Sequence, residues 1–256
     1  MPLHKKSKPY STLFHAKNTA PVKFPRATSE IYKEKEERGY DDKSAFTHEP
    51  TWRIFRIMSE FVEGFQFLTK FQKEVTFLGS ARLQPGTTYY EDAVKLARML
   101  AKEGYTIITG GGPGIMEAAN KGATEGKGNS VGINIQLPFE QRINKYVKQG
   151  IGFHYFFTRK VILSASAQTY IFFPGGFGTL DEFFEIITLI QTHKMEKIPV
   201  VLVGKDYWEP LIAWIDNILL SKFGAINKED REIFKLVDTI EHAFNIVKQS
   251  KQRRMF

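Results

Sequence analysis

The stretch best suited to chemistry runs from Pro174 to Glu182 and reads PGGFGTLDE. It follows a β-branched and aromatic run, Tyr170–Phe173, which predicts a central strand that Pro174 ends because proline cannot donate to a sheet ladder. After Thr179, apolar residues return at helical spacing, at positions 180, 183, 184, 187 and 190. A glycine-rich turn from strand to helix offers free backbone N–H groups and a positive helix end to an anion. We therefore expect a phosphate group to bind in this turn.

Two further glycine-rich segments follow predicted strands in the same way. They are Gly79-Ser80-Ala81 and Gly110–Gly114. In a parallel sheet with helices on both faces, ligands bind outside the carboxyl ends of the strands, where all three loops would lie. A single turn of this kind is weak evidence, because close packing of a strand on a helix also demands glycine. Three in one sheet indicate a nucleotide-like ligand.

Two common phosphate-binding motifs do not fit the sequence. The dinucleotide fingerprint would need glycine where Ile115 follows Gly110 and Gly112. The segment 122–128 resembles a P-loop, but its spacing is one residue short and Gly128 replaces the hydroxyl residue that would hold magnesium. Both NAD binding and ATP hydrolysis are therefore disfavoured.

From Val75 onward, strands and helices are expected to alternate. Strands are predicted at 75–78, 105–109, 130–135, 170–173, 198–203 and 234–237, and helices at about 89–103, 115–124, 158–167, 179–193, 208–220 and 239–249. The segment between residues 136 and 157 is interpreted as a polar connection. This alternation predicts an α/β fold, a Rossmann-like doubly wound parallel sheet.

The amino-terminal part has a different character. Residues 1–29 contain four prolines and no periodicity, so we expect disorder, followed by a charged connector. Residues 51–71 carry apolar side chains at three- and four-residue steps, which predicts an amphipathic helix that packs on the main domain or on another subunit. The expected organisation is a basic tail and connector at 1–50 and a nucleotide-binding catalytic domain at 51–256, with this helix as its N-terminal extension.

Composition excludes several classes of protein. There is no cysteine, and the six histidines are scattered, so we expect no disulfide, no metal site and no cofactor. No apolar stretch approaches the roughly 20 residues of a membrane span, and the basic N-terminus lacks a signal-peptide core, which favours a cytoplasmic protein without a membrane partner. The net charge of +8 lies partly in the tails. Basic tails could bind nucleic acid, and a nucleic-acid-associated protein is one alternative function. Solvated tails are the commoner explanation of such charge, so no nucleic-acid partner is expected.

The motif at 174–182 resembles the PGGxGTxxE motif of the Lonely Guy (LOG) family. Gly79-Ser80, Gly111-Gly112 with Met116, and Arg159-Lys160 resemble other family landmarks in the same order. The resemblance covers about residues 51–250. Segments 52–65, 138–141 and 191–192 look like the longer bacterial type II branch, which implies a homo-oligomer, at least a dimer, with a hexamer as the larger alternative.

The resemblance implies a phosphoribohydrolase. Such an enzyme hydrolyses the N-glycosidic bond of a nucleoside 5′-monophosphate, cytokinin riboside 5′-monophosphate or AMP, to the free base and ribose 5-phosphate. Older labels call such proteins lysine decarboxylases, but no lysine here has a recognisable pyridoxal-phosphate context. A different class of function stays open, namely a nucleotide-binding or sensing module without turnover.

Carried over by motif, Arg159 and Glu182 resemble the catalytic pair. The implied substrate contacts are Ser80, Gly111, Lys160, Gly175, Gly176, Gly178, Thr179 and Thr188. Each assignment has a simpler alternative. Thr179 and Glu182 have the spacing of a capping box, which needs no substrate, and Arg159 could be a surface cation. The aromatic residues between 153 and 157 could stack on a base, although core packing is the commoner use.

Overall fold

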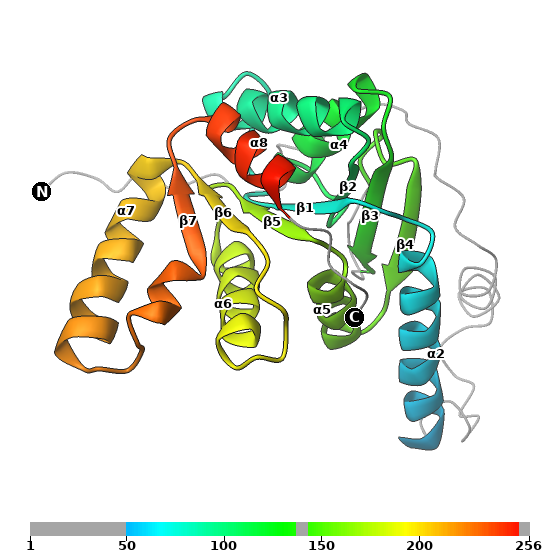
Figure 1. Ribbon diagram of the computed structural model, residues 1–256. Helices are drawn as coiled ribbons and strands as arrows, with labels where there is room; N and C mark the ends of the chain where they lie inside the picture. Colours follow the sequence, from blue (N-terminus) through cyan, green and yellow to red (C-terminus); the bar gives the residue numbers. More distant parts are fainter. Residues whose placement is uncertain (1–49, 137–142, 251–256) are drawn as a thin grey trace, which may run out of the picture.

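A computed structural model of the chain describes residues 50–136 and 143–250. Within these residues seven strands form one parallel sheet in the order β4-β3-β2-β1-β5-β6-β7 (Figure 1). The strands are β1 (Glu74–Leu78), β2 (Thr106–Thr109), β3 (Ser130–Ile135), β4 (Gln149–Phe153), β5 (Thr169–Phe172), β6 (Val200–Val203) and β7 (Phe234–Val237). The prediction of a Rossmann-like doubly wound sheet is confirmed.

Strand β1 is at the centre of the sheet. The order runs outward from it through β2, β3 and β4 on one side, and through β5, β6 and β7 on the other. Strands β1 and β5 pair in parallel, with Val75 opposite Thr169 and Leu78 opposite Phe172. Chain direction around the sheet therefore reverses at this pair, which makes the ends of β1 and β5 the topological switch point, where such folds bind ligands.

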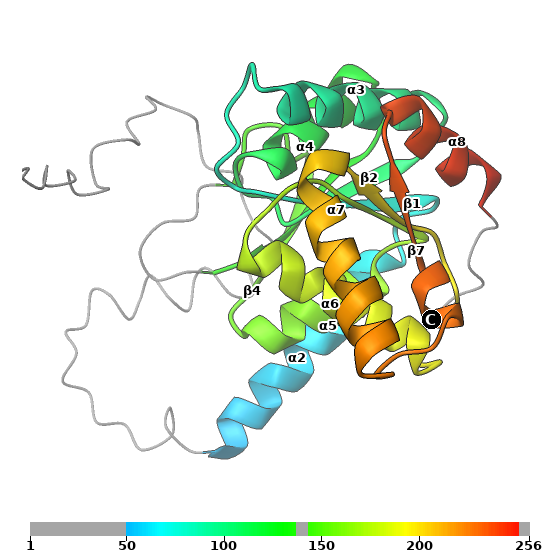
Figure 2. The same ribbon diagram turned by 90° about the vertical axis from the view of Figure 1, so that its left-hand side faces the viewer.

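Helices cover both faces of the sheet (Figure 2). One layer holds α3 (Thr88–Lys102), α4 (Ile115–Glu125) and α8 (Ile240–Gln249), and the other holds α5 (Phe156–Ala165), α6 (Phe177–Gln191) and α7 (Lys205–Trp214). Because strand side chains alternate between faces, the sheet contributes to two apolar cores. Phe77 and Phe173 lie in the first core, and Phe172 packs against Trp208 in the second.

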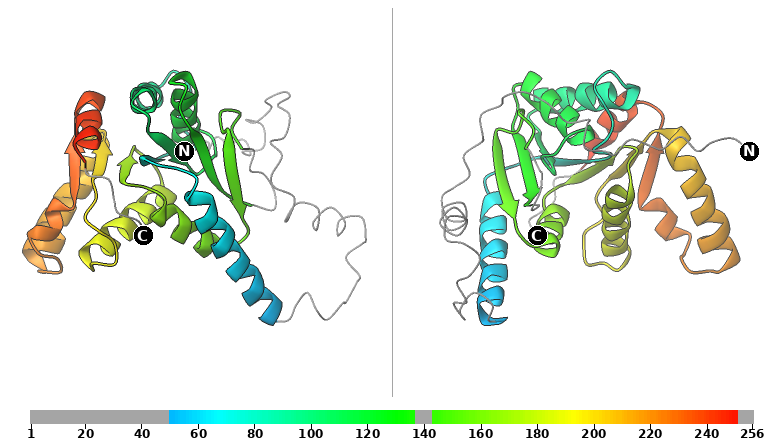
Figure 3. Two further views of the ribbon diagram at one scale, coloured as in Figure 1. Left: turned by 45° about the vertical axis from the view of Figure 1, so that its right-hand side comes forward. Right: turned by 180° about the vertical axis from the view of Figure 1, so that it is seen from behind.

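The predicted amphipathic helix is α2 (Pro50–Leu68). Its carboxyl-terminal part, with Phe67 and Leu68, is buried against the main domain beside α5, as expected. Its amino-terminal half extends past the other helices (Figure 3). The apolar side chains there are about half exposed: Trp52, Ile54, Phe55 and Met58. This helix therefore covers one edge of the domain and leaves a second apolar face open.

Two elements differ from the sequence prediction. Strand β4 lies where a polar connection was expected, and it pairs in parallel with β3 at the edge of the sheet. Its Gly150 and Gly152 weaken the strand pattern, because glycine is rare in strands. Helix α7 begins at Lys205, three residues before the predicted start at Trp208, and it contains Pro210. It continues directly into a π-helix, η3 (Ile215–Lys222).

Several predictions fall on residues that are not described. These are the tail and connector before Pro50, the segment 138–141 and the basic residues from 251 onward. Among the described helices, none is both long and apolar enough to cross a membrane.

Candidate active site

The three glycine-rich loops meet through backbone hydrogen bonds around Ser80. The Ser80 N–H donates to the carbonyl of Pro174 (2.9 Å), and the Ser80 carbonyl accepts from the N–H of Ile115 (3.0 Å). The loop after β1 is thereby tied to the loop after β5 on one side and to the start of α4 on the other. The sequence prediction that these loops share one edge of the sheet is confirmed.

Helix α6 begins in the middle of the motif. Its N-cap is Gly176, which has no side-chain oxygen, so the first helical residues are Phe177, Gly178 and Thr179. The capping-box interpretation is therefore wrong, because Thr179 occupies the third helical position and not the cap. Phe177 and Gly178 are exposed, so the first turn directs its N–H groups toward open space. The motif thus forms a helix terminus suited to an anion.

The glycines of this loop serve two purposes. A Cβ atom on Gly175 would lie 2.0 Å from Thr179 Oγ1, so the fold itself requires glycine there. A Cβ on Gly176 or Gly178 would meet nothing within 4 Å. Packing within the described chain therefore does not explain these two glycines, whereas close approach of a ligand does. The Tyr207 hydroxyl fixes the loop by donating to the Gly175 carbonyl (2.6 Å).

Glu182 lies in the second turn of α6 and is only 5% exposed. None of the described residues forms a hydrogen bond with its carboxylate. Burial raises the pKa of Glu182 from 4.5 to about 7, although the charges of Lys160 and Arg159 act in the opposite direction. Such a carboxyl is divided between its acid and base forms near neutral pH, which is the property of a general acid or base.

Arg159 projects from the first half of α5 toward the loop after β2. Its Nε donates to the carbonyl of Ile133 (3.0 Å), and a Cβ on Gly110 would lie 2.6 Å from Nη2. No described residue accepts a hydrogen bond from Nη1 or Nη2. Burial lowers the pKa of Arg159, and Glu182 partly offsets this effect. The guanidinium is therefore held along one edge and keeps donors available. The residue is half-buried, which does not fit the surface-cation interpretation.

Lys160 joins α5 to α6. Its ammonium forms ion pairs with Asp181 (2.5 Å) and Glu185 (2.7 Å), and its side chain is 17% exposed. These two carboxylates flank Glu182 on α6, one residue before it and three after it. Lys160 therefore fixes the position of α6 relative to α5 and places positive charge near Glu182.

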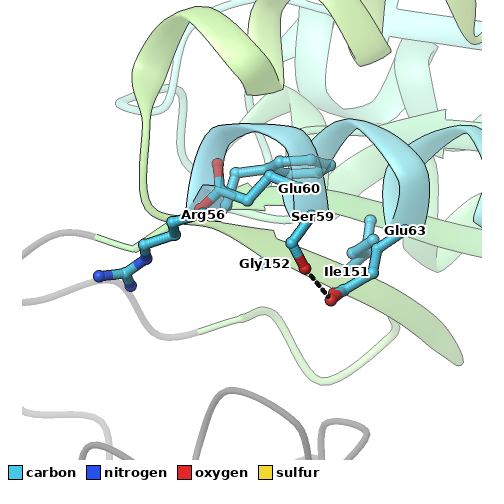
Figure 4. Close-up of a pocket in the computed structure, with 7 residues that line it drawn as sticks. Arg56, Ser59, Glu60, Glu63, Ile151 and Gly152 are labelled. Carbon is cyan, nitrogen blue, oxygen red and sulfur yellow. Dashed lines mark hydrogen bonds between the residues drawn. The ribbon is translucent and has the colours of Figure 1, made fainter. Parts of the chain in front are cut away.

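The arginine-bearing helix α5 is held in turn by α2 through a buried carboxylate, Glu60. Its Oε1 accepts from the N–H of His154 (2.8 Å), and its Oε2 accepts from the N–H of Tyr155 (3.3 Å) and the hydroxyl of Thr158 (2.5 Å). Glu60 thus fixes the two residues that lead into α5 and the Thr158 hydroxyl in its first turn, next to Arg159. The same side chain lines a small hollow between α2 and β4 (Figure 4), together with Arg56, Ser59, Glu63, Ile151, Gly152 and Phe153.

A buried amide network supports the loop after β2, and sequence reasoning missed it. Asn144 donates to the carbonyls of Gly111 (3.1 Å) and Gly112 (2.9 Å) and to the side chain of Asn120 (3.0 Å). The hydroxyl of Thr109 donates to Asn120 (2.7 Å) and accepts from the Gly111 N–H (2.9 Å). A signal existed in Asn120, a polar residue at an inward position of an otherwise apolar helix face.

The structure brings together most of the predicted site residues. Around the loops lie Ser80, Gly111, Arg159, Lys160, Gly175, Gly176, Gly178, Thr179 and Glu182. Thr188 is different: it is exposed and about 9 Å beyond Glu182 along α6. Its assignment to the substrate stays a prediction. Of the aromatic residues, Phe153 is core, whereas Phe156 and Phe157 are about half exposed.

These features define a class: an α/β protein with a helix amino terminus suited to an anion at the switch point of a parallel sheet, beside a buried carboxyl and a guanidinium. The family model described as possible lysine decarboxylase matches residues 116–247. The chain belongs to this family, the Lonely Guy family of the relatives reported next.

Two relatives illustrate the similarity. A rice protein named probable cytokinin riboside 5′-monophosphate phosphoribohydrolase LOGL5 is 32% identical over 161 residues, which are 60% of this chain and 63% of the rice protein. The cytokinin riboside 5′-monophosphate phosphoribohydrolase of Rhodococcoides fascians is 28% identical over 156 residues, 59% of this chain and 78% of that protein. The match thus spans less than two thirds of the rice protein.

Solved structures share the fold. The X-ray structure of TM1055, a structural genomics target, superposes with a TM-score of 0.50 at 26% identity, and covers 69% of this chain and 99% of its own. The molybdenum cofactor carrier protein of Chlamydomonas reinhardtii gives a TM-score of 0.52 at 22% identity, with 70% of this chain and 97% of its own covered. At this identity the carrier protein is evidence for the fold alone.

Proposed function

We propose that this protein hydrolyses the N-glycosidic bond of nucleoside 5′-monophosphates. Water is the second reactant, and the products are the free base and ribose 5-phosphate. The proposed substrates are AMP, cytokinin riboside 5′-monophosphate or both, since the relatives from rice and Rhodococcoides are named for the latter.

In this proposal the 5′-phosphate binds at the start of α6. The exposed N–H groups of the first turn and the positive end of the helix dipole complement its charge, and Gly176 and Gly178 leave room for its oxygens. Glu182 lies five residues beyond the first helical residue, about 7.5 Å along the axis. Helical side chains lean back toward the amino terminus, so its carboxylate faces the region that the ribose of a bound nucleotide would occupy.

The carboxylate then acts at the anomeric carbon. As the bond from this carbon to the base nitrogen lengthens, its electron pair leaves with the base and positive charge develops on the sugar. Ionised Glu182 stabilises that charge and accepts a proton from the water molecule whose oxygen forms the new bond to carbon. The departing base takes up a proton from solvent. Because the ionised form is required, activity should rise as pH increases through about 7, the pKa of Glu182.

Arg159 supplies fixed positive charge opposite this carboxylate. Its unpaired Nη groups can bind the substrate phosphate or a sugar oxygen, while the bond from Nε to the Ile133 carbonyl fixes the plane of the guanidinium. It also favours the ionised form of Glu182. Both effects assist the same step.

The observation that carries the proposal is Glu182, a buried carboxyl with no hydrogen bond from the described chain and a pKa near neutrality, in the second turn of a helix whose amino terminus is open to an anion. A protein that only bound nucleotides would gain nothing from burying this charge. The test is incubation with a panel of nucleoside monophosphates, followed by quantification of free base and ribose 5-phosphate. Tight binding without release from any nucleotide would instead support the binding module.

A further inference from the structure

Asn134, at the carboxyl end of β3, is buried with no hydrogen bond. It is 3% exposed, and neither Oδ1 nor Nδ2 has a partner within residues 50–136 and 143–250. Buried carboxamides nearly always form hydrogen bonds, because an unpaired one carries its full desolvation cost. At the edge of a parallel sheet where ligands bind, an unpaired amide indicates a partner that arrives with the ligand.

Three glycines lie next to this amide. A Cβ atom on Gly111 would lie 2.4 Å from Oδ1 and 2.6 Å from Nδ2, and one on Gly132 would lie 3.0 Å from Oδ1. On the neighbouring strand the register partner of Asn134 is Gly152. Gly111 has a φ of 72°, which favours glycine, and it follows Gly110, the residue that packs against the guanidinium of Arg159. Asn134 and the proposed catalytic Arg159 therefore lie beside consecutive residues of the same loop, Gly111 and Gly110.

Nearby amides show that the fold satisfies such groups elsewhere. Asn120 donates to the hydroxyl of Ser130 (2.9 Å) and accepts from Thr109, and Asn144 donates to two loop carbonyls. Asn144 thus fixes the loop after β2 directly, and Asn120 does so through Thr109 and Asn144. Asn134, on the same side of β3 as Ser130, takes no part in that network, so supporting the loop does not account for it.

We propose that Asn134 is a specificity-determining residue that hydrogen-bonds a ribose hydroxyl of the nucleotide, an inference that rests on the proposed function. A carboxamide donates and accepts without carrying charge, and a ribose hydroxyl also does both. The amino edge of adenine could pair in the same way, but removing a sugar hydroxyl would not affect that contact. The phosphate only accepts, and the start of α6 already offers it N–H donors. A site built to bond a hydroxyl rejects the analogue that lacks it, because the buried partner is then left unpaired.

The test compares sugars in the full chain. For the wild type and Asn134→Leu, kcat/KM is measured with AMP, 2′-deoxy-AMP and 3′-deoxy-AMP. We expect the wild type to prefer AMP over one of the deoxynucleotides by at least about tenfold, and the Leu variant to lose most of that preference. Each ratio is taken on one preparation, so it does not depend on the fraction of active protein. Removing an unpaired buried amide should leave Tm unchanged or higher.

Control variants distinguish a failure of the proposed role of Asn134 from a failure of the proposed enzymatic function. Asn129→Leu makes the same chemical change just before the amino end of β3, and it should keep the wild-type ratio. Asn134→Ala repeats the sugar comparison with a smaller side chain, in case the Leu variant fails to fold. Unchanged preference in the Asn134 variants, or equal losses with all three nucleotides, would overturn the inference. If the wild type releases no base, the proposed function fails instead, and the same ratios measured as Kd by calorimetry still decide the role of Asn134.

Discussion

Replacing Glu182 by glutamine tests the proposed role of this residue through two effects of opposite sign. The substitution keeps the shape of the side chain and removes its ionisation. Burial raises the pKa of Glu182 to about 7, whereas the unfolded chain should titrate near the ordinary value of 4.5. A difference of about 2.5, at about 1.36 kcal/mol for each pKa unit, corresponds to about 3 kcal/mol. This is the cost of keeping the ionised carboxylate buried.

The sign follows from proton binding. Between pH 4.5 and about 7 the folded protein holds a proton that the unfolded chain has released, so this group reduces the free energy of unfolding as pH rises through that window. The glutamine variant does not titrate there. It should match the wild type in stability near pH 4.5 and exceed it by about 3 kcal/mol above pH 7, a rise in Tm of about 10 °C.

Turnover should change in the opposite direction. Without a base at this position, release of the base from AMP should fall by roughly 10²-fold or more, while AMP still binds at the start of α6. Thermal unfolding at pH 5 and pH 8, AMP affinity and base release are measured on one preparation, with the surface variant Glu209→Gln as the control. Near-native release by Glu182→Gln would remove this residue from the mechanism, and a stability difference that does not vary with pH would refute its burial as an ionised group.

Three further predictions concern the surroundings of the site. Lys160→Met should raise the pKa of Glu182, because it removes the larger of the two favourable charge effects and leaves Asp181 and Glu185 without their ion-pair partner. The acid limb of the pH–rate profile should therefore move above pH 7, and an unmoved limb would contradict this role of Lys160. Glu60→Ala should cost about 3 kcal/mol of stability, since two backbone N–H groups and the Thr158 hydroxyl lose their acceptor. Glu63→Ala, one turn further along α2, should cost less than about 0.5 kcal/mol, and equal losses in denaturant titrations would show that the hydrogen bonds of Glu60 contribute little. The exposed apolar face of α2 continues on α5 through Phe156, Phe157 and Val161, and we expect a second copy of the chain to cover it. Light scattering should then give at least twice the 29.4 kDa mass of one chain. A monomer mass at micromolar concentration would refute this prediction.

The sequence predicted the sheet because most of its strands are short apolar runs between glycine or proline residues. It failed at β4, where Gly150 and Gly152 hide the pattern, and where pairing with β3 and not local preference forms the strand. The start of α6 was placed two residues late, since a glycine N-cap leaves no side-chain signal and Thr179 resembles a cap.

The site was only partly predictable. The motif indicated Glu182 and the glycine loops, but the burial that raises the pKa of Glu182 depends on packing between α5 and α6. The pairing of Lys160 with Asp181 and Glu185, and the hydrogen bonds of Glu60 at the start of α5, join residues far apart in the chain. The burial of the unpaired Asn134 amide likewise depends on distant residues that pack around it. Such contacts follow from the topology, and a single sequence carries no local pattern for them.

In the proposed mechanism the glycine loop anchors a 5′-phosphate while Glu182 acts on the glycosidic bond of the same molecule. The sharpest measurement compares AMP with adenosine, which has the same bond and no phosphate. We expect release of adenine and ribose 5-phosphate from AMP in equal amounts, increasing as pH rises through about 7, and little release from adenosine. Equal rates with both compounds, or nucleotide binding without any release of adenine, would contradict it.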